Sequence, residues 1–135
     1  MSAVGAALAC AAEQFIGAPF RLHGRDPATG LDCVGVIAAA LQAIGRDPVV
    51  PSGYALRQCD VGGHLHTAEH NAFAPASGSI SPGDLLLVRP GPAQHHLLVA
   101  GSSGGFIHAH AGLRRVVHAP PPLQWPILRH WRLDE

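Results

Sequence analysis

Apolar residues follow a helical period in the first third of the chain and a strand-like pattern in its second half. Between residues 3 and 16 they recur every three or four positions, which predicts an amphipathic helix. A second apolar run extends from Asp32, an acidic N-cap candidate, to Gly45, a glycine C-cap candidate. This run predicts the central helix of the fold, with Cys33 in its first turn. Residues 20–31 are rich in turn-forming residues and predict a loop.

Short apolar runs separated by proline and glycine turns make up the second half and predict antiparallel strands. The predicted strands are Asp84–Arg89, His96–Ala100, Gly105–His110, Arg114–Ala119 and a last one near Ile127–Leu133. Residues 46–82 are interrupted by prolines and glycines and predict at most short helices at 54–60 and 65–73. Helices followed by strands indicate an α+β fold, with N-terminal helices packed on a C-terminal antiparallel sheet. With 135 residues, nearly half of them apolar, we expect one domain over residues 1–135.

The charge balance narrows the choice of partners. Nine basic and nine acidic residues cancel, so the basic surface typical of a nucleic-acid-binding protein is not expected. No apolar run approaches the roughly 20 residues that span a bilayer, and no Lys or Arg precedes the apolar N-terminus, as it would in a secretion signal. We therefore expect synthesis in the cytoplasm without a signal peptide, and neither a nucleic-acid nor a membrane partner.

Cysteine and histidine are the residues that suggest chemistry. Three cysteines do not indicate a disulfide framework, so at least one thiol should be free. A helix N-terminus lowers the pKa of a thiol, and this favours Cys33 as a nucleophile. Such a nucleophile needs an imidazole within reach, oriented by a third polar group. His95 and His108 lie at the start and the end of two predicted neighbouring strands, which would bring them together at the rim of the sheet.

Simpler interpretations exist for most of these residues. An apolar-flanked cysteine is more often a packed residue than a catalyst, and Cys10 and Cys59 are interpreted as structural thiols. His64, His66 and His70 are close enough in sequence to suggest a metal site, but no closely spaced pair of cysteines accompanies them. We therefore expect these three histidines to be exposed, and expect neither a metal nor a cofactor.

Five motifs in a fixed order carry a family resemblance. They are Phe15-Ile-Gly-Ala-Pro-Phe-Arg, Gly30-Leu-Asp-Cys-Val-Gly-Val, Ser81-Pro-Gly-Asp-Leu-Leu, His95-His-Leu-Leu-Val-Ala-Gly and Phe106-Ile-His-Ala. Over most of the chain this set resembles the NlpC family of papain-like cell-wall peptidases. The resemblance implies a papain-like fold with the nucleophile, Cys33, at the N-terminus of the central helix. It further implies His95 as the general base and His108 as the group that orients it.

Three positions depart from the family pattern. Phe20 stands where the family commonly has a tyrosine near the oxyanion site, and it cannot donate a hydrogen bond. Val34 replaces the usual serine after the nucleophile. His96 directly follows His95, and consecutive residues of a strand point to opposite faces of the sheet. The family pattern favours His95 as the base, with His96 as the alternative.

The resemblance also implies a function. The expected reaction is hydrolysis of peptidoglycan stem peptides, typically between D-glutamate and a diamino acid, through a thioester on the cysteine. A bare module of this kind is similar to the cell-wall peptidases of phage tails and gene transfer agents. We therefore expect tail or baseplate partners and action in the periplasm or on the cell wall. Two alternatives stay open: a papain-like amidase or acyltransferase on another amide, and a catalytically weak structural tail module, which Phe20 favours.

Overall fold

The first two helices of the chain form where the apolar periods predict them. The computed structural model describes residues 2–50 and 62–135, with α1 at Ala3–Glu13 and α2 at Cys33–Ala43. Asp32 caps α2, because its carboxylate accepts the Gly35 N–H at 2.8 Å. Gly45, with φ of +89°, follows α2 in the left-handed conformation in which helices commonly end. In the described part of the chain, no helix has the length and apolarity needed to cross a membrane.

The main sheet has six antiparallel strands in the order β3-β8-β4-β5-β6-β7. Their bounds are Phe73–Pro75 for β3, Leu85–Val88 for β4, His96–Ala100 for β5, Phe106–His110 for β6, Arg115–Ala119 for β7 and Ile127–Leu133 for β8. The last strand of the chain therefore inserts between β3 and β4. The α+β class and the five predicted strands are confirmed, although β8 is not the edge of a simple meander.

Several short elements depart from the sequence expectations. Residues 20–31, predicted as a loop, contain the two-residue strands β1 (Arg25–Asp26) and β2 (Gly30–Leu31), which pair with each other. Strands this short contain too few residues to show an alternating pattern. The third helix, α3, spans Gly62–Glu69 and so begins before and ends before the predicted helix at 65–73. The predicted helix at 54–60 lies outside the described residues.

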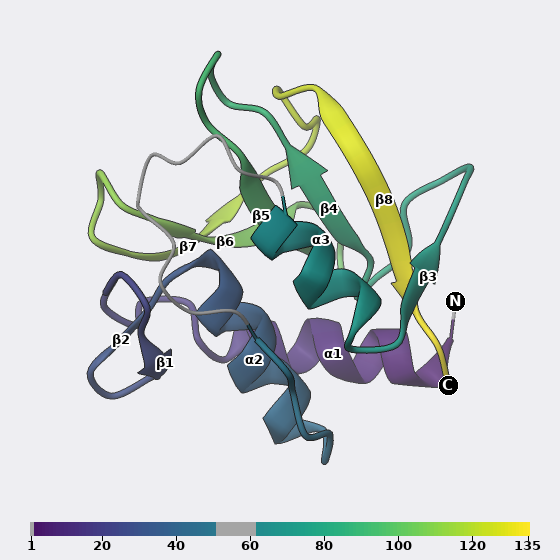
Figure 1. Cartoon of the computed structure of the whole chain (residues 1–135), viewed down its shortest axis with the longest axis horizontal. Coiled ribbons are helices and arrows are strands. Elements are labelled where there is room, and N and C mark those ends of the chain that lie inside the picture. Colours follow the sequence, from purple (N-terminus) through teal and green to yellow (C-terminus); the bar gives the residue numbers. More distant parts are fainter. Residues whose placement is uncertain (1, 51–61) are drawn as a thin grey trace.

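The two faces of the sheet are covered by different parts of the chain. On one face α1 and α2 lie side by side (Figure 1), and the main core forms between them and the strands. Leu8, Ile37 and Leu97 are among its fully buried side chains, and truncation of such a residue to alanine typically costs about 2–5 kcal/mol. On the opposite face a smaller apolar cluster forms. Its members are Leu86, Val88, Leu98 and Phe106, covered by Leu123 and Trp125 from the connection between β7 and β8.

Candidate active site

Cys33 is the first residue of α2, and the preceding residue anchors it. The Asp32 carboxylate accepts the His23 N–H at 2.8 Å and pairs with the Arg25 guanidinium at 3.0 Å. The loop that supplies these donors lies so close to α2 that a side chain on Gly35 would meet the Gly24 carbonyl oxygen at 2.0 Å. The motif Asp-Cys-Val-Gly thus fixes the N-terminal turn of α2 against this loop.

The Cys33 thiol lies against the beginning of β5. The backbone N–H groups of Leu97 and Val34 donate hydrogen bonds to it. The ladder between β5 and β6 covers only Val99 and Ala100, whereas the first residues of β5 pair with β4. The thiol therefore lies at the end of β5 that pairs with β4 alone, where the sequence places His95 and His96.

The protein around Cys33 favours the protonated thiol. Burial and, second, the negative charge of Asp32 together raise the pKa of Cys33 to about 12, although the Leu97 and Val34 N–H groups and Arg25 act in the opposite direction. The expectation that the helix N-terminus leaves this thiol with a lowered pKa is therefore wrong, because burial and Asp32 outweigh it. At neutral pH the sulfur keeps its proton, so nucleophilic attack requires a base to remove it.

Two consecutive histidines lie at this end of β5, His95 just before the strand and His96 as its first residue. Leu97 and Val99 lie in the core shared with α2, whereas Leu98 lies in the opposite cluster. By the alternation of a strand, His95 shares the face of Leu97 and His96 shares that of Leu98. The His96 ring accordingly contacts the Trp125 ring, with centroids 6.2 Å apart. If this alternation extends one residue before β5, the His95 imidazole lies on the Cys33 side; its Nδ1 is buried without a hydrogen-bond partner among the described residues.

His108 pairs with the other histidine. Its Nδ1 lies 2.9 Å from His96 Nε2, and the two rings share a hydrogen bond. The predicted contact, in which His108 orients the His95 ring directly, is not what the structure shows. The reason is strand register: Val99 pairs with Ile107, which places His108 on the face of Leu98 and His96. A shift of one residue would have turned His108 to the Cys33 side. The catalytic roles of Cys33, His95 and His108 stay predictions.

Comparison with known proteins identifies the architecture. No protein-family model matches the sequence, and no curated protein matches it significantly. Solved structures do match. NlpC1 from Trichomonas vaginalis is 21% identical with a TM-score of 0.67, and the match covers 95% of this chain and 44% of that one. NlpC2 from the same organism is 19% identical with a TM-score of 0.68, and the match covers 98% of this chain and 48% of that one. The NlpC/p60 domain of the peptidoglycan hydrolase SagA also matches (28%, 0.58, 86% and 88%). The chain has the NlpC/P60 fold. It spans about half the length of the two Trichomonas proteins.

The other described residues that the sequence analysis singled out lie on α1, on or next to α3, and in the segment before α2. Cys10 is an exposed thiol on α1, 3.6 Å from the Ser102 hydroxyl, and Cys59 falls in the undescribed segment. The rings of His66 and His70 stack with centroids 3.9 Å apart. Across residues 2–50 and 62–135, no group of three or more His, Cys, Asp or Glu residues is arranged to hold a metal ion. Phe20 packs against the helix-side core of the NlpC/P60 fold.

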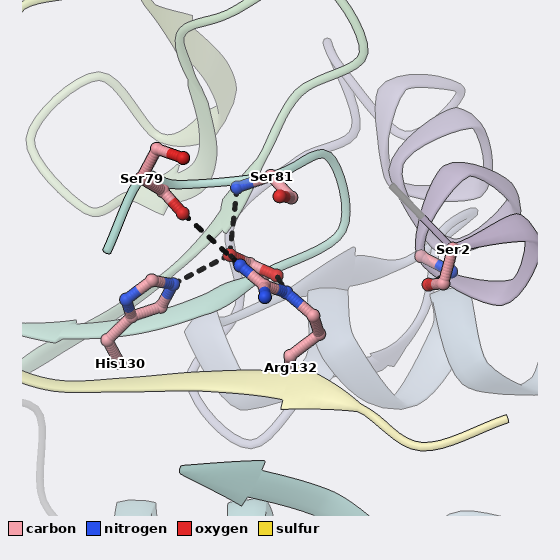
Figure 2. A network of polar contacts seen from close by, with 7 residues as sticks. Ser2, Ser79, Ser81, His130 and Arg132 are labelled. Atoms are coloured by element: carbon pink, nitrogen blue, oxygen red, sulfur yellow. Dashed lines mark hydrogen bonds and ion pairs between the residues drawn. The ribbon is translucent and has the colours of Figure 1, made fainter. Parts of the chain in front are cut away.

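A buried ion cluster was not anticipated from the sequence. Asp84 ends the Ser-Pro-Gly-Asp turn of this NlpC/P60 fold and is fully buried. Its carboxylate accepts the Ser81 N–H at 2.8 Å, binds Arg132 through Nε (2.9 Å) and Nη2 (2.8 Å), and contacts His130 Nε2 at 2.6 Å (Figure 2). The alternation of His130 and Arg132 along β8 is the signal that could have indicated it, since both then face one side of the sheet.

Proposed function

We propose that this chain is a cysteine peptidase that hydrolyses peptidoglycan stem peptides, with Cys33 as nucleophile and His95 as general base. The observation that carries the proposal is the Cys33 thiol beside the Leu97 N–H at the start of β5, because strand alternation would place the neighbouring His95 imidazole on this face. The similarity to the NlpC/p60 domain of a peptidoglycan hydrolase supports the substrate class.

The proposed reaction is acyl transfer. His95 accepts the Cys33 proton as the sulfur attacks the amide carbonyl, and the imidazolium then protonates the leaving amine. The N–H groups of Leu97 and Val34 already face the sulfur and stabilise its negative charge as the proton leaves. A backbone N–H in the first turn of α2 has no helical partner and can donate to the oxyanion. Water then hydrolyses the thioester and releases the acid product, and a proton from this water restores the Cys33 thiol.

Digestion of purified sacculi tests the proposal. Wild-type protein should release soluble muropeptides, and mass analysis should locate the cut between D-glutamate and the diamino acid. Cys33→Ala should abolish release, while Cys10→Ala, which removes an exposed thiol on α1, should keep it. Equal inactivity of wild type and Cys33→Ala on every wall preparation would contradict the proposal.

A catalytically weak structural module is the second candidate. Phe20 offers no hydroxyl to the oxyanion, and the raised pKa of Cys33 makes the resting thiol unreactive. Under this alternative, sacculi bind the protein but are not cleaved. A third reading, an amidase or acyltransferase on another amide, would instead show Cys33-dependent turnover of simple amides and no muropeptide release.

Delivery in a phage-like particle is the remaining part of the proposal. The sequence resemblance to peptidases of phage tails and gene transfer agents supports it, and it implies tail or baseplate partners and action in the periplasm or on the wall. Mass spectrometry of purified particles from the producing cells should detect the protein in the tail fraction. Its presence only in the soluble cell extract would contradict this part.

A further inference from the structure

The start of β5 pairs with β4 but lies outside the backbone ladder with β6, and the candidate chemistry depends on it. Its backbone ladder with β6 covers only Val99 and Ala100, and pairing with β4 begins at His96 opposite Val88. His95, one residue earlier, lies before the strand, and its Nδ1 has no partner among the described residues. The orientation of the His95 ring therefore depends on how the adjoining backbone is held.

The His96–His108 hydrogen bond supplies a link between β5 and β6 at this point. The 2.9 Å contact joins the first residue of β5 to the third residue of β6, beyond the last backbone pair of the two strands. His108 is buried, and Trp125 lies edge-on to both rings at 5.6 and 6.2 Å. The link is therefore shielded from water by the connection between β7 and β8.

The pair stays uncharged at neutral pH. Burial, together with the neighbouring His108, His64 and His110, lowers the pKa of His96 to about 3. Burial and His110 lower the pKa of His108 to about 4. One neutral ring donates its N–H and the other accepts it, so the hydrogen bond persists at neutral pH.

We propose that His96 is a positioning residue, whose hydrogen bond to His108 fixes the start of β5 and thereby holds the His95 ring and the Leu97 N–H at the Cys33 thiol. This inference rests on the proposed function. It assigns His108 an indirect role, through His96 and the backbone, in place of direct contact with the His95 ring. A displacement of about 1 Å at a reacting group can reduce a rate roughly a hundredfold, which sets the scale of the expected effect.

The test compares two substitutions at one position. His96→Leu removes the hydrogen bond and leaves His108 Nδ1 unpaired. His96→Gln places an amide near the former Nε2 and can still donate to His108. His118→Leu is the matched control, because His118 is an exposed histidine on β7 whose Nε2 lies 3.3 Å from the Gly104 carbonyl oxygen.

Alkylation of Cys33 by iodoacetamide, followed by site-resolved mass spectrometry, is the main readout, because it needs no cell-wall substrate. His96→Leu should slow alkylation at pH 7 roughly tenfold to a hundredfold, as His95→Ala should. His96→Gln and His118→Leu should stay within about threefold of wild type on the same scale. Circular dichroism at pH 7 should show that each variant is folded. Unchanged alkylation in folded His96→Leu would overturn the proposal, as would equal slowing in His96→Leu and His96→Gln.

Muropeptide release separates this inference from the proposed function. In sacculus digestion, His96→Leu should lower kcat while leaving KM within about twofold, because a positioning residue acts on the reacting groups and not on substrate binding. A change confined to KM would overturn the inference. If the alkylation pattern is as expected but wild type releases no muropeptide, the positioning role holds and the assigned substrate fails.

Discussion

Two polar clusters lie on the sheet face away from α2, and both contain histidine. In the first cluster the Asp84 carboxylate binds His130 and Arg132. In the second, His96 and His108 share a hydrogen bond. Leu86, which pairs with His130 across the sheet, belongs to the same apolar cluster as Leu98. The two sites therefore share a face of the sheet but differ in whether a carboxylate is present.

The presence of a carboxylate determines whether the groups of each cluster are charged or neutral in the folded protein. Burial by itself would raise the pKa of Asp84, but hydrogen bonds from Arg132, the Ser81 N–H and His130 outweigh it and lower the pKa. The first cluster therefore contains a charged Asp84 carboxylate paired with the Arg132 guanidinium. The His96–His108 pair has no such counter-ion among its described contacts, and burial holds both rings neutral. We infer that the first cluster joins β8 to the Asp84 turn, whereas the second is a neutral link beside the candidate active site.

The largest stability effect should follow from removal of the carboxylate charge. Asp84→Asn leaves Arg132 and His130 without their anion, and the loss of one partner from a buried ion pair typically costs about 3–5 kcal/mol. Because Arg132 retains 37% of its side-chain exposure, we expect a value near about 3 kcal/mol in urea unfolding. Glu69→Gln, an exposed acid on α3, is the control and should change the value by less than about 0.5 kcal/mol. Similar values for both variants would remove the distinction between the two clusters.

Acid should weaken the fold through the neutral pair. Unfolded histidine binds a proton near pH 6.5, whereas the folded rings do so only near pH 4 and pH 3. The stabilisation is thus complete above pH 6.5 and is lost as pH falls toward these values. Each such ring lowers the free energy of unfolding by up to about 1.4 kcal/mol per pH unit in this window.

A double variant isolates that contribution. His96→Gln with His108→Asn keeps polar atoms near both former ring nitrogens but removes the titration. Urea unfolding between pH 7 and pH 4.5 should show a flatter decline than in wild type. Asp84 affects a lower window, because its contribution is lost only as pH falls below about 3.8, the ordinary value of its pKa. Parallel declines in wild type and the double variant would contradict the assignment.

Phe20→Tyr should have the smallest effect on stability, since Phe20 is only partly buried and touches neither polar cluster. We expect a change below about 1 kcal/mol. Its hydroxyl would restore a donor near the oxyanion, and a donor of this kind is worth roughly 2.7–4 kcal/mol of transition-state stabilisation at most. Turnover of muropeptide substrate should therefore rise. An unchanged or lower turnover would mean that the oxyanion site is already complete without this position.

The long elements could be predicted from the sequence because each has a clear pattern. The run from Asp32 to Gly45 has a cap at both ends, and α2 forms there. β5 was predicted with the bounds that the structure gives. The two-residue strands β1 and β2, which pair with each other, were not predicted, because strands this short show no alternating pattern.

The candidate site was only partly predictable, because its geometry depends on register and burial. Alternation is a property of one strand, and it accounts for the side of the sheet on which His96 lies. The choice of His95 as the base stays a prediction. The partner of His108 depends on how β6 aligns with β5 across the turn, which local sequence does not specify. The raised pKa of Cys33 depends on the packing around the thiol, and the motif itself gives no indication of it.

Muropeptide release from sacculi by His95→Gln and His96→Gln tests most directly whether the face of the sheet decides the role of each histidine. Loss of a general base typically lowers a rate by roughly 10²–10⁴-fold, and we expect a loss in that range for His95→Gln. His96→Gln keeps its link to His108 and should stay within about threefold of wild type. The reverse result, with His96→Gln inactive and His95→Gln active, would contradict the account by assigning the base to the face away from Cys33.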